Sequence, residues 1–228
     1  MAKQRPLSER LSKLPPGRHL IPSDYVSQNQ RERILLATAE LVAERGYQKT
    51  TIELIAKTSR VALVTFYEHF PGKEECFLAA FDESVAAAKE VFAELLASEQ
   101  PWQEQISAGL EIFLEMVVKE QARAKLCIVE AQAAGTASLA RYQEMLESVA
   151  PKLREGREFN PRASRLPDGL EVAIAGGIVW LVHQRLVADD VDDLMVLLPE
   201  MLQVTLTPYV GEVEAGRAAD AAQARVAA

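Results

Sequence analysis

The sequence predicts an all-α protein, on three observations. Residues that favour helices, chiefly Ala, Leu, Glu and Val, dominate the composition. Apolar residues recur at three- and four-residue spacing over long stretches, which is the period of an amphipathic helix. Prolines and glycines fall mainly between these stretches, where helices end. The chain has 228 residues, enough for one large domain or two modest ones with real cores.

Composition narrows the class of protein further. The first residues are polar and basic and lack the apolar stretch of a signal peptide. The longest apolar stretch, VAIAGGIVWLV, is too short to cross a membrane. The two cysteines lie far apart, with no CxxC pattern and no nearby His, so we expect free thiols, no metal and no cofactor. We therefore predict a soluble, cytoplasmic protein with no membrane partner.

The charge is divided unevenly along the chain. The formal net charge is −8, yet residues 1–75 carry 12 Lys and Arg against 9 Asp and Glu, a net charge of +3. The remaining residues carry 13 against 24, a net charge of −11. A weakly basic head on an acidic body fits a protein whose head alone approaches a polyanion. Ordinary variation in composition is the alternative.

Residues 1–22 are predicted to form a basic flexible arm. The stretch LPPGRHLIP holds three prolines and a glycine, so no helix passes through it. Arg18 is the residue of this arm that we single out. The arm is either a disordered tail or a strand that lies along a phosphate backbone or in a minor groove.

A long helix and two short ones follow within residues 23–75. In SQNQRERILLATAELVAERGY the apolar residues recur at helical spacing, and Gly46 is a plausible end. Thr50 and Glu53 have the spacing of a capping box, so a short helix begins at about Thr51. A third helix covers about 62–69 and is ended by the Pro and Gly at 71–72. A long helix then begins at Lys73 and continues to about 98.

Two short helices joined by a tight turn form a helix-turn-helix unit. In such a unit the second short helix lies in the major groove of DNA. We expect Val61, Phe66 and Phe70 to face the core of the three helices. We expect Leu63, Val64 and Tyr67 to point outward.

Residues 28–77 resemble the DNA-binding region of the TetR family of transcription regulators. The shared features are Arg45-Gly46-Tyr47, Thr50-Thr51-Ile52, Ile55-Ala56, Thr65-Phe66-Tyr67, His69-Phe70 and Lys73-Glu74. The resemblance implies an all-helical homodimer with a helix-turn-helix DNA-binding domain at 23–75. It also implies a larger helical domain at 76–210 that binds a small molecule and dimerises.

The resemblance also assigns roles at the DNA. Thr65, Tyr67, His69 and Lys73 would hold the phosphate backbone. The alternative is that Tyr67 and His69 only pack the small core. Arg60 stands where the family usually has a glycine. Ala62, Leu63 and Val64 replace the usual polar base contacts and can touch thymine methyl groups but cannot make bidentate bonds to bases. The candidate DNA-binding residues are Thr51, Arg60, Ala62, Leu63, Val64, Thr65, Tyr67, His69, Lys73 and Arg18.

Beyond residue 76 the chain is predicted to remain helical. The expected helices span about 73–98, 102–118, 120–134, 138–156, 168–187 and 190–207, with a kink at Pro199 and a flexible tail at 211–228. By the resemblance, the last two long helices pair with their copies in a second subunit; core packing within one chain is the alternative. The candidate interface residues are Ala173, Gly177, Leu181, Leu194, Leu198 and Met201.

The same helices would enclose a small-molecule effector that the sequence does not identify. Each candidate wall residue could equally be plain core. His183 could orient a polar ligand group or be a satisfied core or interface histidine. The candidate ligand-binding residues are Trp102, Phe113, Met116, Cys127, Met145, Trp180 and His183.

An enzyme is disfavoured because the chain contains no HExxH, no GxSxG and no phosphate-binding glycine loop. We expect a ligand-responsive repressor that binds double-stranded operator DNA as a homodimer. The alternative is a dimeric small-molecule-binding protein whose DNA recognition is weak or lost.

Overall fold

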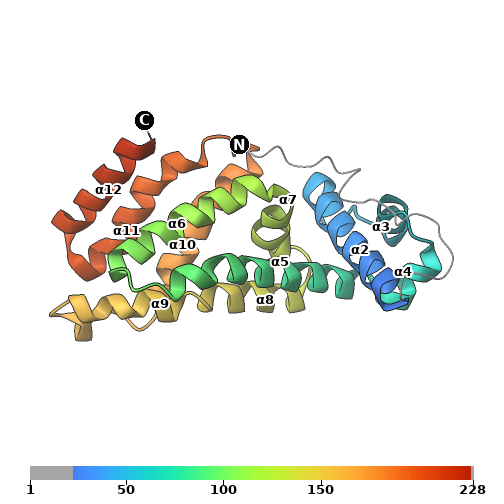
Figure 1. Cartoon of the computed structure of the whole chain (residues 1–228), viewed down its shortest axis with the longest axis horizontal. Coiled ribbons are helices and arrows are strands. Elements are labelled where there is room, and N and C mark those ends of the chain that lie inside the picture. Colours follow the sequence, from blue (N-terminus) through green and yellow to red (C-terminus); the bar gives the residue numbers. More distant parts are fainter. Residues whose placement is uncertain (1–22, 227–228) are drawn as a thin grey trace. The chain divides into compact units, whose positions relative to one another are not determined.

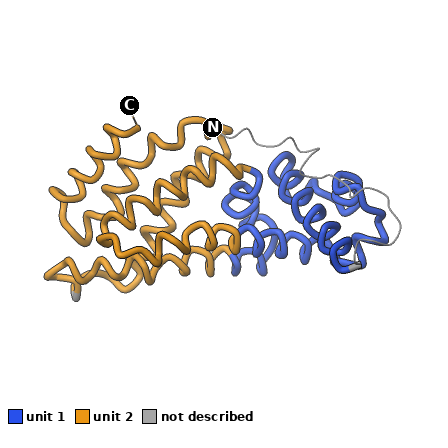
Figure 2. The backbone as a smooth tube through the Cα atoms, viewed as in Figure 1, with its two compact units in different colours: residues 1–84, 122–141 blue, residues 85–121, 142–228 orange. Residues whose placement is uncertain are grey.

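The computed structural model describes residues 23–226, and every element in that part of the chain is a helix (Figure 1). The predicted all-α fold is confirmed. The predicted arm at 1–22, with Arg18, lies outside the described residues. The chain forms two compact units, one combining residues 23–84 with 122–141 and the other combining 85–121 with 142–226 (Figure 2). Residues 76–84 and 122–141, which we expected in the second domain, therefore cluster with the helix-turn-helix.

The first unit is built on the three predicted N-terminal helices. They are α2 (Ser23–Arg45), α3 (Ile52–Ser59) and α4 (Leu63–His69), followed by the start of α5 (Lys73–Leu96). Helix α2 ends where Gly46 adopts a positive φ of 80°, which suits a residue without a side chain. Fully buried Ile34, Ile55 and Phe66, one from each of these three helices, form the core between them.

The start of α3 differs from the predicted capping box. The N-cap is Thr51, whose side chain accepts a hydrogen bond from the Leu54 backbone N–H at 3.3 Å. Thr50 is buried, and its hydroxyl donates to the Gly46 carbonyl at 2.9 Å instead. The capping box at Thr50 is therefore wrong by one residue, because the Thr50 side chain is engaged by the preceding turn.

The predicted helix at 120–134 is broken into three pieces. They are α7 (Gln121–Ala124), a π-helical turn (Lys125–Val129) and a 3-10 turn (Glu130–Gln132). The consecutive residues Leu126, Cys127 and Ile128 are all buried, an arrangement that a regular surface helix does not give. The next predicted helix, 138–156, is also divided, into α8 (Thr136–Glu147), α9 (Ala150–Arg154) and a 3-10 turn (Glu155–Phe159). A proline in the first turn of α9 explains the new start.

The second unit contains the C-terminal half of α5, α6 (Trp102–Lys119), α9, a 3-10 turn (Ala163–Arg165), α10 (Leu170–Val187), a 3-10 turn (Leu194–Leu197), α11 (Leu198–Val210) and α12 (Glu212–Val226). Its core includes fully buried Leu114, Leu186 and Tyr209. An aromatic cluster stabilises it: the Trp102 ring stacks on Phe159 at 5.6 Å and meets the edge of Tyr209 at 5.3 Å.

Two further predictions about this unit are wrong. Pro199 does not kink a helix; it lies in the first turn of α11, where its missing N–H costs nothing. The predicted flexible tail at 211–228 is helical over Glu212–Val226. Ala215, Ala219 and Ala222 share one face of α12 and are buried, with α11 as the helix that α12 contacts most. The small side chains let the two helices approach closely, which orders the segment.

Candidate functional site

The helix-turn-helix presents the predicted face of α4 to solvent. The exposed fractions of Leu63, Val64 and Tyr67 are 43%, 65% and 51%, while Phe66 is fully buried. Ala62 is the exposed N-cap of α4, and its side chain makes no capping bond. The outward positions predicted for Leu63, Val64 and Tyr67 are therefore confirmed. An exposed face this apolar on a short helix is available for contact with another molecule.

The predicted phosphate-contact residues lie at the end of α4 and the start of α5. Thr65, His69 and Lys73 are half-buried. The Lys73 ammonium donates to the Tyr47 carbonyl at 3.0 Å and lies 4.1 Å from the centre of the Tyr47 ring. These contacts hold a cation at the N-terminus of a 24-residue helix, where backbone N–H groups also favour an anion.

His69 is held differently. Its Nε2 lies 3.5 Å from the Gln30 amide oxygen. Burial lowers the pKa of His69, and the nearby Arg31 lowers it further, although Glu68 acts in the opposite direction. The lowered pKa favours the neutral ring, which would offer one N–H donor to a phosphate rather than a full charge.

The turn between α3 and α4 is left-handed at Arg60, with φ 55° and ψ 42°. A buried arginine of α2, which sequence reasoning missed, supports this turn. Arg33 is 4% exposed; its Nε donates to the Ser59 carbonyl at 2.9 Å and its Nη2 to the Arg60 carbonyl at 2.9 Å. The available signal was its spacing: Arg33 lies four and eight residues before the buried Ala37 and Leu41, on the core face of α2.

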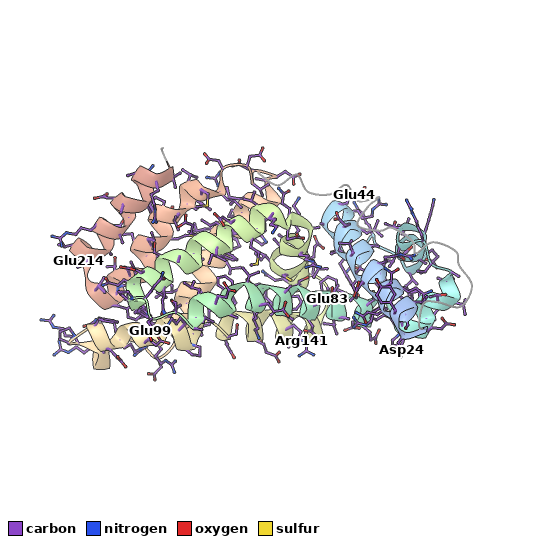
Figure 3. The ribbon with its side chains drawn as sticks, in the orientation of Figure 1. Asp24, Glu44, Glu83, Glu99, Arg141 and Glu214 are labelled. Atoms are coloured by element: carbon purple, nitrogen blue, oxygen red, sulfur yellow. The ribbon has the colours of Figure 1, made fainter. Side chains whose placement is uncertain are left out.

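Residues 122–141 contact the helix-turn-helix within the first unit. The Glu130 carboxylate accepts a hydrogen bond from the Tyr47 backbone N–H at 2.8 Å. Glu83 of α5, labelled in Figure 3, lies 3.7 Å from Arg31 of α2 and 3.8 Å from Arg123 of α7. Sequence spacing gave no sign of these contacts, which join residues far apart in the chain.

Comparison with known proteins identifies the N-terminal unit. The family model described as "Bacterial regulatory proteins, tetR family" matches residues 34–80, which include α3, α4 and the start of α5. Residues 34–80 therefore match the DNA-binding region of the TetR family. The resemblance stated from the sequence is therefore confirmed.

Curated relatives are similar over a short part of the chain. An uncharacterised HTH-type transcriptional regulator of Mycobacterium tuberculosis is 38% identical over 65 residues, 28% of this chain and 32% of that protein. The HTH-type transcriptional regulator TcmR of Streptomyces glaucescens is 41% identical over 64 residues, 27% of this chain and 28% of that protein. The match thus spans about a third or less of the length of these relatives.

Solved structures share the fold over most of the chain. The fatty acid degradation regulator FadR of Bacillus halodurans has a TM-score of 0.69 at 20% identity, covering 78% of this chain and 94% of that chain. FadR of Bacillus subtilis, in complex with stearoyl-CoA, has a TM-score of 0.64 at 19% identity, covering 77% and 97%. These likenesses show that the chain shares the fold of these two proteins beyond the helix-turn-helix.

The candidate ligand-binding residues are not brought together as one set. Trp102 is buried, and its Nε1 donates to the Lys152 carbonyl at 2.8 Å, so it belongs to the core alternative. Cys127 is buried in the first unit. Trp180 is 57% exposed on α10 and so does not line a closed pocket. The half-buried candidates, all in the second unit, are Phe113, Met116, Met145 and His183.

His183 is not a satisfied core histidine. Its Nδ1 is buried and has no hydrogen-bond partner among residues 23–226, and its ring stacks on Trp180 with the centroids 5.2 Å apart and 9° between the planes. A buried polar atom without a partner is uncommon in native structures. The atom is therefore available to a group outside the described residues.

The candidate interface residues divide into two groups. Ala173 and Gly177 are exposed and Leu181 is half-buried, so all three remain available on α10. Leu194, Leu198 and Met201 are at most 1% exposed within one chain. Their assignment to a dimer interface is wrong, because the core of the second unit already covers them; core packing is the correct alternative.

Helix α10 also meets the length and composition of a membrane-crossing helix. Its 18 residues have a mean hydropathy of 1.4, and 39% of them are buried. It is longer than the apolar stretch that sequence analysis judged too short. Core helices of soluble proteins pass the same test, and one such helix is weak support for a membrane span.

Proposed function

We propose that this TetR-family chain is a repressor that binds operator DNA as a homodimer and is released by a small molecule. The observation that carries the proposal is the exposed face of α4 on a helix-turn-helix that the family model matches. The second short helix of such a unit enters the major groove. The proposal gives the chain a regulatory role without a catalytic step, and a cytoplasmic location where it meets DNA.

Recognition of the operator sequence by α4 would depend on the shape of the DNA and on its thymine methyl groups. Ala62, Leu63 and Val64 offer no hydrogen bonds to base edges, but their side chains can contact thymine methyl groups. Arg60, exposed in the turn before α4, has a side chain that can donate two bonds to a guanine. Leu63→Ala should then change the preference among operators that differ in thymine positions. An unchanged preference would refute methyl readout.

The phosphate contacts would come from both sides of the α4–α5 junction. Tyr67 and Thr65 offer hydroxyls, His69 offers one N–H, and Lys73 offers its charge at the helix N-terminus. The hydrogen bond from Lys73 to the Tyr47 carbonyl supports this role, because it fixes the direction of the ammonium before DNA arrives. Such contacts position the protein without reading sequence.

A second copy would pack on the exposed face of α10. Ala173, Gly177 and Trp180 lie along this face at helical spacing and are exposed. Apart from the helix's own backbone, no atom of the described residues lies within 4 Å of a Cβ built on Gly176 or Gly177, so the bare backbone is open to a partner. A two-fold pair would place two α4 helices about 34–36 Å apart, one in each of two successive major grooves.

The effector would bind in the second unit beside half-buried apolar residues. Phe113, Met116 and Met145 offer apolar contact, and His183 Nδ1 offers an unsatisfied polar atom. Structural neighbours that bind small molecules include Bacillus subtilis FadR with stearoyl-CoA and RolR with resorcinol. A ligand that prefers one separation of the two heads would shift the protein between bound and released states.

A second candidate function is a dimeric small-molecule-binding protein with weak or lost DNA recognition. The apolar run at 62–64, exposed at the start of α4, is the observation that favours it. The two candidates differ in salt dependence, because a protein that neutralises phosphates loses DNA affinity steeply as salt rises.

Fluorescence anisotropy separates the two. The purified protein is titrated against the intergenic DNA upstream of its own gene and against a scrambled duplex, at two salt concentrations. Selective, salt-sensitive binding supports the repressor and yields an assay for ligands that release the complex. Salt-sensitive binding without selectivity points to a different operator or to an α4 too apolar to discriminate. No binding to either duplex by a folded dimer free of copurified ligand refutes the repressor.

A further inference from the structure

The turn that presents α4 carries an arginine in a conformation that favours glycine. Arg60 has φ 55°, in the left-handed region that side chains disfavour. Two backbone bonds close the turn around it: Arg60 N–H to the Lys57 carbonyl at 3.2 Å, and Val61 N–H to the Ala56 carbonyl at 3.0 Å. Without glycine at position 60, this conformation needs support from elsewhere in the domain.

Arg33 supplies that support from a different helix. Its guanidinium donates to the carbonyls of Ser59 and Arg60, and its Nη1 lies 3.5 Å from the Asn29 side-chain oxygen. Nη2 makes a second, short bond to the Ser59 carbonyl. The last carbonyls of a helix have no partner within the helix. A planar guanidinium can serve two neighbouring carbonyls at once, which an ammonium cannot do as well.

We propose that Arg33 is a positioning residue for the recognition helix, holding the left-handed turn and thereby the angle at which α4 and the Arg60 side chain meet DNA. The proposal rests on the proposed DNA binding. Arg33 is almost fully buried, so it acts through the turn without touching DNA. Arg60 is exposed and free to make the contact.

The first test needs no DNA. Amide hydrogen exchange is measured on the full chain and on the Arg33→Met and Thr38→Val variants. Thr38 is the matched control: it lies on the same helix, is 1% exposed, and its hydroxyl bonds to the Ile34 carbonyl, away from the turn. Arg33→Met should speed exchange at Arg60 and Val61 by about tenfold more than at α2 and α5 amides, the loss expected of one charge-assisted hydrogen bond. Equal acceleration throughout the domain, or none, overturns the proposal.

The second test measures DNA selectivity and salt dependence together. Arg33→Met should reduce the ratio of operator to scrambled-duplex affinity by about tenfold, with the slope of log affinity against log salt unchanged, because no phosphate contact is removed. Arg33→Lys should recover part of the ratio, and it keeps the test valid if Arg33→Met fails to fold. A reduced salt slope would make Arg33 a phosphate contact, and an equal loss in Thr38→Val would make it a generic core residue; either result overturns the proposal.

The two tests also separate this proposal from the proposed function. If the parent protein binds no DNA, the repressor proposal fails at that step. Hydrogen exchange at Arg60 and Val61 still decides whether Arg33 holds the turn. If the parent binds selectively and Arg33→Met keeps the full ratio, the positioning role fails and the repressor stands.

Discussion

Replacing the two glycines in the middle of α10 with alanine should stabilise a single chain but weaken the association of two chains. Gly176 and Gly177 lie within a helix of 18 residues, and a Cβ at either would meet nothing within 4 Å in residues 23–226 other than the helix's own backbone. In a single chain, replacing both with alanine should stabilise the fold by about 2 kcal/mol, because each glycine in a helix interior costs about 1 kcal/mol relative to alanine.

If a partner helix packs on this face, the same replacement should make association less favourable. Two-fold symmetry places each new methyl group in the interface twice. Overpacking a close contact costs about 1–3 kcal/mol, and each 1.4 kcal/mol weakens association about tenfold. The double variant Gly176→Ala and Gly177→Ala should therefore raise the dimer dissociation constant by at least about tenfold. It should at the same time make the separated chains harder to unfold.

Sedimentation equilibrium and chemical denaturation at several protein concentrations measure the two effects. Gly216→Ala is the matched control, since Gly216 lies inside α12 and a Cβ there also meets nothing within 4 Å. It should add about 1 kcal/mol of stability and leave association unchanged. Unchanged association of the double variant, combined with the full gain in stability, would refute the α10 interface.

Three further predictions concern the fold. Gly156→Ala should destabilise the chain by about 3 kcal/mol in denaturant titrations, because its Cβ would lie 2.4 Å from the buried Trp102 ring; Gly169→Ala, with nothing within 4 Å, should change stability little. The Arg157 guanidinium, hydrogen-bonded to Glu171, lowers the pKa of that carboxyl. The contribution of this ion pair to the stability of the fold should therefore be complete above the ordinary pKa of 4.5, and it should disappear as the pH falls through the lowered pKa of Glu171 in the folded protein. Glu171→Gln should weaken this loss of stability at acid pH in denaturant titrations, and an unchanged pH dependence would contradict the assignment. Burial raises the pKa of both cysteine thiols to about 12, so a thiol reagent at pH 8 should react only as fast as the protein opens; a rapid reaction would show that a thiol is exposed.

The local pattern of the sequence predicted the helix-turn-helix well. The outward positions of Leu63, Val64 and Tyr67 and the burial of Phe66 follow from helical periodicity, which depends only on neighbouring residues. The sequence pattern predicted helix starts less reliably where a polar side chain can bond to either of two nearby backbone groups. Thr50 turned back to the Gly46 carbonyl, so the cap fell to Thr51.

Sequence by itself determined the all-α class, the order of the main helices and the likeness to the TetR family, because these depend on periodicity and on short motifs. Tertiary structure decided which apolar faces are covered. Leu198 and Met201 are buried in their own chain, and the alanines of α12 dock on α11 where a loose tail was expected. It also decided that Arg33 serves the turn of the helix-turn-helix. The physical reason is the same in each case: burial and long-range hydrogen bonds depend on which distant segments meet, and helical periodicity describes only one segment at a time.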